Sequence, residues 1–445
     1  MKEVYYKKTL PVKKVRVANF RGVSIDWFSK SLPIDYAVKQ ENLKTLNGVL
    51  VATKTPKELK IIFDDKIEKI IPYTDGIVKL LVVCEHSTYI LETVNGEFVK
   101  TPLQVDFKIL DSTRYKYGEE DYLILATDNG LKKFEKGIVS DTEVNYNFDK
   151  VCNHYYRIFA AGKNTTKLEF SDDFAPFNWT QSIDEGGYIN LTFENGNITD
   201  LISFNEYLIA SQTDGFTKIV GYSEQEDFVV KSVESPNNIK SDSVVNCGDY
   251  IMYATNKGFG IFDGYNCKSI NEELSSFLKD YNVQAQACNE YCYFLCKNTT
   301  DEFAENYIIA YDLVRKDYHF ISCADAKFIQ TVKVNSVENL LVVYDNQIKV
   351  LMDNTNSETK VWQSGVIDFD KPEGEKLLKK IVFGGKTIID LKITVDGQNY
   401  FYSISNKRSV LLNLKGKEFV LQIEPKGINI AVPSPVLEYQ VLEGF

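Results

Sequence analysis

The residues that could carry acid–base chemistry are few and scattered along the chain. The 445 residues include only three histidines, His86, His154 and His319. Hydrolases that rely on histidine pair it with a partner at fixed spacing, as in HExxH or a nucleophile elbow, and no such spacing occurs here. Carboxylate pairs carry no information, because 62 acidic residues make such pairs inevitable. The sequence therefore predicts no catalytic residue.

The cysteines do not have the spacing of a metal site. Cys288, Cys292 and Cys296 have C-x3-C-x3-C spacing, which fits neither zinc-binding pairs nor an iron–sulfur pattern. Cys292 and Cys296 share one face of a strand-like run with Phe294, so we expect them to be buried. Eight cysteines in a chain of this length are no disulfide framework, and we expect reduced thiols. The sequence predicts no metal and no cofactor.

Charge and hydropathy exclude further classes of protein. A net charge of −11 opposes tight binding to nucleic acid through phosphate contacts, although a local basic patch would still permit some contact. The N-terminus carries positive charge without an apolar stretch behind it, so we expect no signal peptide. No run of 18 apolar residues occurs, so we expect no membrane span.

The elements that would position any site are strands, and they recur. The repeated template is an aromatic or long apolar residue, three or four further apolar residues, a polar turn with Gly or Asn, and a second strand. An aromatic share of 13% fits this pattern, because aromatic side chains suit half-buried pleated surfaces. The centres of the apolar runs are Val82, Ile124, Ile158, Leu208, Met252, Tyr293 and Val342.

The spacing of these centres predicts a β-propeller. They lie 42, 34, 50, 44, 41 and 49 residues apart, which suits four-stranded blades. We therefore expect an all-β protein with a six- or seven-bladed propeller. Residues 48–64 hold two further strand patterns, which we expect to complete the last blade and close the ring. A short helix is expected over residues 271–281.

The strand pattern changes near residue 360. Residues 361–445 contain strands of different spacing, which predict an additional C-terminal antiparallel β domain, sandwich-like in form. The first 45 residues hold few paired strand signals and are typical of an extended arm. The predicted organisation is an N-terminal arm over 1–45, a propeller over 46–360 and a β domain over 361–445.

One segment, residues 154–221, departs from the repeat. After a strand and a hairpin, the stretch SDDFAPFNW forms a turn in which Pro176 fixes φ and Trp179 supplies a large side chain. Gly186 and Gly187 then begin a new strand. We predict that Trp179 is a buried anchor rather than a ligand contact.

This segment resembles a recurrent segment of tailed-phage virion proteins of the head-to-tail hub, or packaged-DNA-stabilisation, type. The shared string is R-I-F-A-A-G … L-x-F-S-D … P-x-x-W … G-G-Y-I-N-L … N-G-x-I-T-D-L-I-S-F-N-E-Y-L-I-A. Residues 19–50 and the strands around ITVDGQNY and FVLQI … VLEYQV are similar to the two ends of those proteins. Usual copies have D-P-x-x-W, where this chain has Ala175 before Pro176. The structural motif residues are Arg157, Gly162, Ser171, Pro176, Trp179, Gly186 and Gly187.

The resemblance implies a structural virion protein at the head-to-tail neck, hub or tail of a tailed bacteriophage. Such a protein would be assembled in the bacterial host cytoplasm as a homo-oligomeric ring, beside other neck or tail proteins. It would seal or extend the DNA channel, through which phage DNA passes without specific binding, and it would not be an enzyme. The acidic balance is compatible with a channel past which DNA slides.

Two other functions stay open at this point. A carbohydrate- or receptor-binding propeller at the tail tip would show exposed aromatic residues on its loops. A propeller-fold glycoside hydrolase would need acidic residues that converge at the central channel.

The basic residues near the N-terminus are the candidate interface. Cyclic rings larger than dimers need two different faces on each chain. The cations on this otherwise acidic protein that we expect to form one such face are Lys7, Lys8, Lys13, Lys14 and Arg16.

Overall fold

The computed structural model describes most of the chain. The described residues are 10–17, 20, 22–24, 32–94, 97–182, 185–221, 227–234, 238–299, 305–334, 336–353, 358–427 and 430–442. Their contacts divide the chain into two compact units. The first unit comprises Met1–Thr55, Tyr307–Ser322 and Met352–Phe445, and the second comprises Pro56–Asn306 and Cys323–Leu351.

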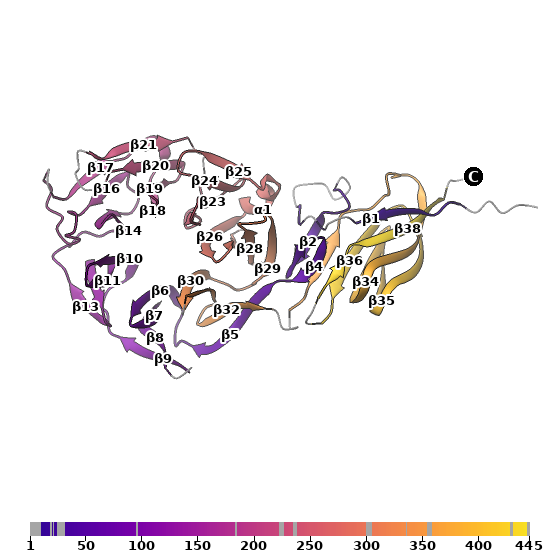
Figure 1. The fold of residues 1–445 in the computed structure, drawn as a ribbon, viewed down its shortest axis with the longest axis horizontal. Coiled ribbons are helices and arrows are strands. Elements are labelled where there is room, and N and C mark those ends of the chain that lie inside the picture. The colour runs from indigo at the N-terminus through magenta and orange to yellow at the C-terminus, as the bar shows by residue number, and fades with distance from the viewer. Residues whose placement is uncertain are drawn as a thin grey trace, which may run out of the picture. The chain divides into compact units, whose positions relative to one another are not determined.

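Seven four-stranded sheets account for most of the described strands, and Figure 1 shows them following one another around a centre. The first three sheets are β6 (Ile67–Asp75), β7 (Ile77–Cys84), β8 (Thr88–Val94) and β9 (Glu97–Leu103); β10 (Ile109–Tyr117), β11 (Glu120–Thr127), β12 (Gly130–Glu135) and β13 (Ile138–Asp141); and β14 (Lys150–His154), β15 (Arg157–Ala161), β16 (Lys167–Phe170) and β17 (Gly187–Asn190). The next three are β18 (Ile198–Phe204), β19 (Tyr207–Gln212), β20 (Gly215–Val220) and β21 (Val229–Val233); β22 (Val245–Asn246), β23 (Ile251–Thr255), β24 (Gly258–Phe262) and β25 (Cys267–Ile270); and β26 (Tyr281–Cys288), β27 (Tyr291–Asn298), β28 (Tyr307–Asp312) and β29 (Tyr318–Ser322). The last is β30 (Phe328–Val334), β31 (Val337–Val343), β32 (Gln347–Asp353) and β5 (Lys54–Ile62).

These sheets confirm the predicted propeller, with seven blades among the described residues. Each of the seven apolar centres identified in the sequence lies in the second strand of one blade. The second strands are apolar along their length because both of their faces are buried. In β11, Leu123 and Leu125 pack with the preceding blade, whereas Ile124 and Ala126 pack with the following one. The core of the propeller therefore lies between neighbouring sheets.

One of the two strands predicted over residues 48–64 closes the ring, whereas the other, β4 (Val49–Ala52), belongs to a separate sheet. β5 is the fourth strand of the sheet whose other strands, β30 to β32, come some 270 residues later in the chain. The backbone N–H of Phe63 donates to Asn346 O at 2.9 Å, and that of Ile67 donates to Asp345 O at 2.7 Å. Phe63 also packs in a buried cluster with residues of the first and last blades. Closure covers blade faces that would otherwise expose apolar side chains.

The C-terminal strands form a seven-stranded sheet of the first unit, in the order β1-β38-β34-β36-β33-β2, with β35 paired to β34. Its strands are β1 (Lys13–Arg16), β2 (Ala37–Glu41), β33 (Val361–Ser364), β34 (Glu375–Val395), β35 (Gln398–Gly416), β36 (Phe419–Pro425) and β38 (Pro435–Leu442). β34 runs on through Gly384 and Gly385. A second, three-stranded sheet contains β3 (Leu43–Leu46), β4 (Val49–Ala52) and β37 (Val432–Pro433).

The N-terminal residues differ from the expected extended arm. β1 pairs antiparallel with β38, and β2 pairs antiparallel with β33, so both are strands of the C-terminal sheet. β3 and β4 pair with each other and with β37, so the propeller strands begin at Lys54 rather than at residue 46 and end at Asp353 rather than at residue 360. The physical reason is that β38 and β33 would be open edges of the sheet, and β1 and β2 from the other end of the chain pair with them.

Helix is confined to short turns in the described residues. These are the 3-10 turns η1 (Phe193–Asn195) and η3 (Glu272–Leu274) and the α-helix α1 (Ser275–Lys279). The last two fall where a helix was predicted, and Leu274 and Leu278 are fully buried there. Within the described part, no helix has the length and apolar character to cross a membrane.

Candidate functional site

The loop between β16 and β17, residues 171–186, is held by one buried arginine. Arg157 comes from β15, and only 2% of its surface is exposed. Its guanidinium donates to Ser171 O at 2.6 Å and to Glu185 O at 3.0 Å, so it joins the two ends of the loop. The Asp173 carboxylate lies 4.0 Å away, and the guanidinium also lies over the Phe170 ring at 5.4 Å. A buried cation with this many partners restrains the described residues at both ends of the loop.

Further contacts make the loop rigid. The Ser171 hydroxyl accepts from the Ile158 N–H at 3.0 Å and donates to Asp172 O at 2.9 Å. The Trp179 indole N–H donates to Pro176 O at 3.0 Å. A side-chain carbon on Gly186 would lie 2.9 Å from Phe170 O, so only glycine fits there without a shift of backbone.

The residues of the shared string are mostly brought together here. Arg157, Ser171, Pro176, Trp179, Gly186 and Gly187 all lie in or against the loop. Gly162 follows the far end of β15, and a carbon added to it would meet Asn147 O at an ordinary 3.6 Å. Trp179 is half-buried rather than fully buried; its ring packs on Phe148, with the centroids 4.9 Å apart. It is a packing residue, as predicted, but it anchors less deeply than expected.

Three exposed aromatic rings gather beside the loop, and we call them the aromatic triad. They are Tyr117 from the β10–β11 hairpin, Tyr156 from the β14–β15 hairpin and Phe174 from the loop. Their ring centroids are 5.2 Å (Tyr117 to Tyr156), 4.9 Å (Tyr117 to Phe174) and 5.1 Å (Tyr156 to Phe174) apart. Their exposed fractions are 47%, 41% and 47%. Sequence reasoning missed this cluster, because its members are 39 and 18 residues apart and carry no shared pattern.

Three carboxylates neighbour members of the triad in the chain or across the β10–β11 pair, and we call Glu119, Glu120 and Asp173 the acidic rim. Glu119 and Glu120 are exposed in the hairpin that carries Tyr117. Asp173 is adjacent in the chain to Phe174. Burial, and then the neighbouring Asp173 charge, raise the pKa of Asp172. The surface near the triad is therefore apolar at its centre and acidic at its edge.

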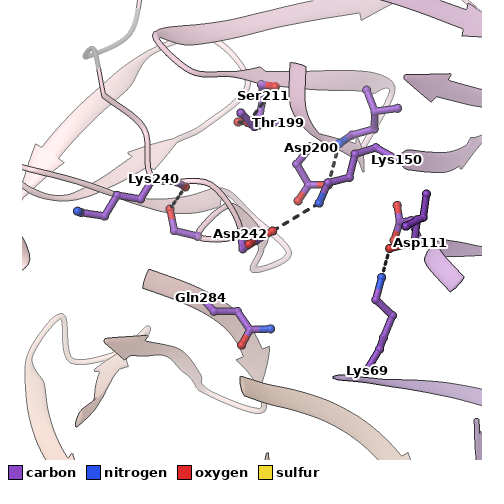
Figure 2. A network of polar contacts seen from close by, with 12 residues as sticks. Lys69, Asp111, Lys150, Thr199, Asp200, Ser211, Lys240, Asp242 and Gln284 are labelled. Carbon is purple, nitrogen blue, oxygen red and sulfur yellow. Dashed lines mark hydrogen bonds and ion pairs between the residues drawn. The ribbon is translucent and has the colours of Figure 1, made fainter. Parts of the chain in front are cut away.

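A second feature is a cavity of about 630 Å³ at the centre of the propeller. It is lined by residues of the first strands of several blades and by residues beside them. Figure 2 shows some of its polar groups, such as Lys69, Asp111 and Lys150, together with neighbours such as Asp200. Lys150 lies between two carboxylates, 3.5 Å from Asp242 and 3.9 Å from Asp200. Lys69 donates to Leu110 O.

The charges in this cavity are balanced against each other. Asp200 raises the pKa of the Lys150 ammonium above its usual range, and this outweighs burial. Burial raises the pKa of Asp200 to about 6, although Lys150 acts in the opposite direction. Burial lowers the pKa of Lys69. A carboxyl that titrates near pH 6 could move a proton, so this is the strongest chemical candidate in the propeller.

Several polar side chains in or beside the first strands, however, join one blade to the next. The Asp111 carboxylate accepts from the Val151 N–H at 2.9 Å, and the Thr113 hydroxyl accepts from the Asn153 N–H at 3.0 Å. Further bonds of this kind run from Asn246 to Ser203 O at 3.0 Å, from Lys240 to Tyr281 O at 2.8 Å and from the Ile329 N–H to Gln284 Oε1 at 2.9 Å. These side chains form hydrogen bonds with backbone groups of the inner strands, which have no neighbouring strand to pair with across the boundary between two blades.

The histidines and cysteines have structural surroundings. His154 Nδ1 lies 2.8 Å from the Ser203 hydroxyl, and burial lowers the pKa of His154 to about 4. Burial lowers the pKa of His319 to about 3. Both are therefore neutral at pH 7. Cys292 and Cys296 are fully buried, as predicted, and all eight cysteines are free thiols. No group of three or more potential metal ligands occurs in the ranges that the structure describes.

The candidate basic interface is only partly described. Lys7 and Lys8 lie outside the described residues. Lys13, Lys14 and Arg16 lie in β1 and are exposed, and Lys14 pairs with Glu438 at 3.0 Å. β1 is the terminal strand of its sheet, so these cations lie along a sheet edge.

The comparisons with known proteins show a likeness of fold and nothing further. The chain matches no protein-family model and no curated protein. Among solved structures it is similar to the extracellular domain of the putative hybrid two component system BT4673 from B. thetaiotaomicron, with 9% identity and a TM-score of 0.45, over 80% of this chain and 48% of that one. It is also similar to YCF48 from Cyanidioschyzon merolae (10%, TM-score 0.45, 67% and 99%) and to the Neurospora crassa Pan2 WD40 domain (9%, TM-score 0.42, 65% and 90%).

The chain spans about half the length of the first BT4673 structure and 63% of a second structure of that protein's extracellular domain. None of these likenesses assigns an activity or a partner to this chain.

Proposed function

We propose that this protein is a structural component of a tailed-phage particle, at the head-to-tail neck, hub or tail, and that it acts through interfaces rather than catalysis. The observation that carries the proposal is the form of the segment that resembles the phage family. Its loop is fixed by Arg157 and presents Phe174 at the surface, beside Tyr156 and Tyr117. A rigid loop with exposed aromatic side chains suits an interface core, because little entropy is lost when it binds.

The central cavity supports the same proposal. The side chains most able to do chemistry there are also those that join neighbouring blades, as Asp111 and Lys150 do. Neither of the buried histidines, His154 and His319, would be charged near neutral pH. The polar residues around the cavity are therefore better suited to hold neighbouring blades together than to convert a substrate.

In this proposal the protein forms a homo-oligomeric ring in the virion, in contact with other neck or tail proteins. Phage DNA passes the ring without specific binding, which a net charge of −11 favours. The particle would be assembled in the cytoplasm of the bacterial host.

A nonsense mutation in the gene, within its native phage, tests this proposal. In a non-suppressing host we expect filled heads that lack a complete tail or lose their DNA, and infectivity should return when the wild-type chain is supplied from a plasmid. Normal yields of infectious particles that lack the protein would contradict the proposal.

A receptor- or glycan-binding role at the tail tip is the second candidate, because the aromatic triad provides the exposed rings that such a role requires. A tail-tip role predicts complete particles that fail to adsorb when the protein is missing. The neck role predicts incomplete particles, so the same mutant separates the two.

A further inference from the structure

The aromatic triad is built to stay exposed. Tyr156 and Phe174 have φ angles of 63° and 53°, a left-handed conformation that is rare for bulky side chains. The Phe174 N–H donates to Tyr156 O at 3.2 Å, which locks these two strained positions together. At Tyr156 the tight β14–β15 hairpin imposes this conformation, because both of its central residues, Tyr155 and Tyr156, have positive φ. The triad is thus a preorganised apolar contact rather than a by-product of loose packing.

The acidic rim indicates the charge of the partner. Neither Glu119 nor Glu120 forms an ion pair within the described part of the chain. Asp173 is only weakly compensated, by Arg157 at 4.0 Å. Aromatic faces attract cations, and unpaired carboxylates around them strengthen that attraction. A surface with basic side chains and some apolar area would complement the triad and its rim.

The chain itself carries such a surface. β1 and the residue before it provide Val12, which is 45% exposed, and the exposed cations Lys13 and Arg16. Among the described strands β1 is the edge of its sheet, and Lys13, Lys14 and Arg16 are exposed along it. The triad belongs to one unit and β1 to the other, so each chain has one surface of each kind.

We propose that β1 of one copy docks on the aromatic triad and acidic rim of a second copy. This contact deepens the proposed function, since it rests on ring assembly. Side chains alternate along a strand, so Val12 and Arg16 lie on one face of β1 and Lys13 on the other. Arg16 lies over an aromatic ring, Val12 covers apolar area of the triad, and Lys13 reaches the acidic rim from the other face of this edge strand. The contact is heterologous, because the two surfaces differ, and heterologous contacts generate rings when the rotation closes.

A charge swap on the full-length chain tests the contact. One variant carries Lys13→Glu and Arg16→Glu, and the other carries Glu119→Lys and Glu120→Lys. In each variant alone, β1 and the acidic rim positions carry charge of the same sign, so the dissociation constant for self-association should rise by at least about tenfold. When the two variants are mixed, every β1 again meets a rim of opposite charge, and association should return. Sedimentation velocity over about 1 to 100 μM protein, at low and at high salt, measures this.

A matched control has the same change of charge at another place. Glu97→Lys with Glu143→Lys alters two exposed carboxylates of the same unit, away from the triad, and should associate as the wild type does. Circular dichroism of each variant excludes misfolding as the cause of a loss. Wild-type protein that stays monomeric throughout, or a mixture that does not recover, overturns the contact.

The outcome also separates this contact from its rivals. If the Glu119 and Glu120 variant associates normally but loses binding on a glycan array that the wild type recognises, the triad is a glycan site and the contact is overturned. If association is unaffected by the swap while the protein is still found in particles, the contact is overturned and the proposed function stands.

Discussion

Replacement of Arg157 by Met should release the loop that carries Phe174. The substitution keeps an apolar stem of similar length against Phe170 but removes the guanidinium. Two hydrogen bonds from a charged donor are lost, to Ser171 O and Glu185 O. Such bonds contribute about 1.5 to 3 kcal/mol each. Since water can reach part of the loop and partly replaces them, we expect a loss of about 3 to 5 kcal/mol.

The assay compares thermal unfolding midpoints and the rate of proteolysis within residues 171–186. A loss of this size should lower the midpoint by about 6 to 10 °C in a unit of this length. Arg114→Met is the matched control, because Arg114 makes an exposed ion pair with Asp121 and should cost about 1 kcal/mol or less. Arg157→Lys should fall between the two. Both carbonyls accept from one guanidinium nitrogen, Nη1, which an ammonium can replace, but the lysine side chain is shorter and lacks the other guanidinium N–H groups. If the Arg157→Met and Arg114→Met variants have the same thermal unfolding midpoint, the loop is not held by Arg157.

Three further changes test packing, backbone and protonation. Trp179→Ala should lower the free energy of unfolding by about 1 to 3 kcal/mol, because the Trp179 side chain is half-buried. Trp362→Ala should lower it by about 3 to 5 kcal/mol, because Trp362 is 0% exposed. Equal midpoints of unfolding in urea would contradict this ranking. Gly186→Ala should cost about 1 to 3 kcal/mol because the new carbon meets Phe170 O, and Gly162→Ala should be nearly neutral, as thermal melting can check. The pKa of His154 falls from 6.5 to about 4 on folding, so the unfolded chain binds more protons and stability is lost as pH falls from about 6.5 to 4. A 2.5-unit shift at 1.36 kcal/mol per unit corresponds to about 3 kcal/mol, which His154→Gln should remove from the pH profile of the melting midpoint.

The propeller could be predicted because its signal is local and repeated. Each second strand is buried on both faces, so runs such as that around Ile124 are apolar without interruption and mark one blade each. The closing strand could also be predicted, because residues 54–62 have a strand pattern with no partner nearby in sequence.

The pairing of β1 and β2 could not be predicted in the same way. These strands are short and mostly polar, and their partners β38 and β33 lie more than 300 residues away. Nothing in the local pattern distinguishes a polar edge strand from an extended arm. The ends of a chain are therefore assigned to a sheet only when the whole fold is known.

The loop could be recognised from the sequence, whereas the triad could not. The shared string identified Arg157, Ser171 and Trp179, because residues that fix a loop lie close together along the chain. Tyr117 comes from another blade and meets Phe174 only in the folded ring. A sequence with 27 tyrosines gives no sign that this one is exposed. Contacts across a blade boundary are set by the closure of the ring.

The most direct measurement for the proposed function is the copy number and position of this protein in purified phage particles. Quantitative mass spectrometry against the major capsid protein, together with cryo-electron microscopy of the neck and tail, provides both. We expect a fixed small number of copies, arranged as a ring around the DNA channel, with β1 of each copy facing the triad of its neighbour. Particles in which the protein is absent, or present in variable trace amounts without an ordered position, would contradict the proposed function.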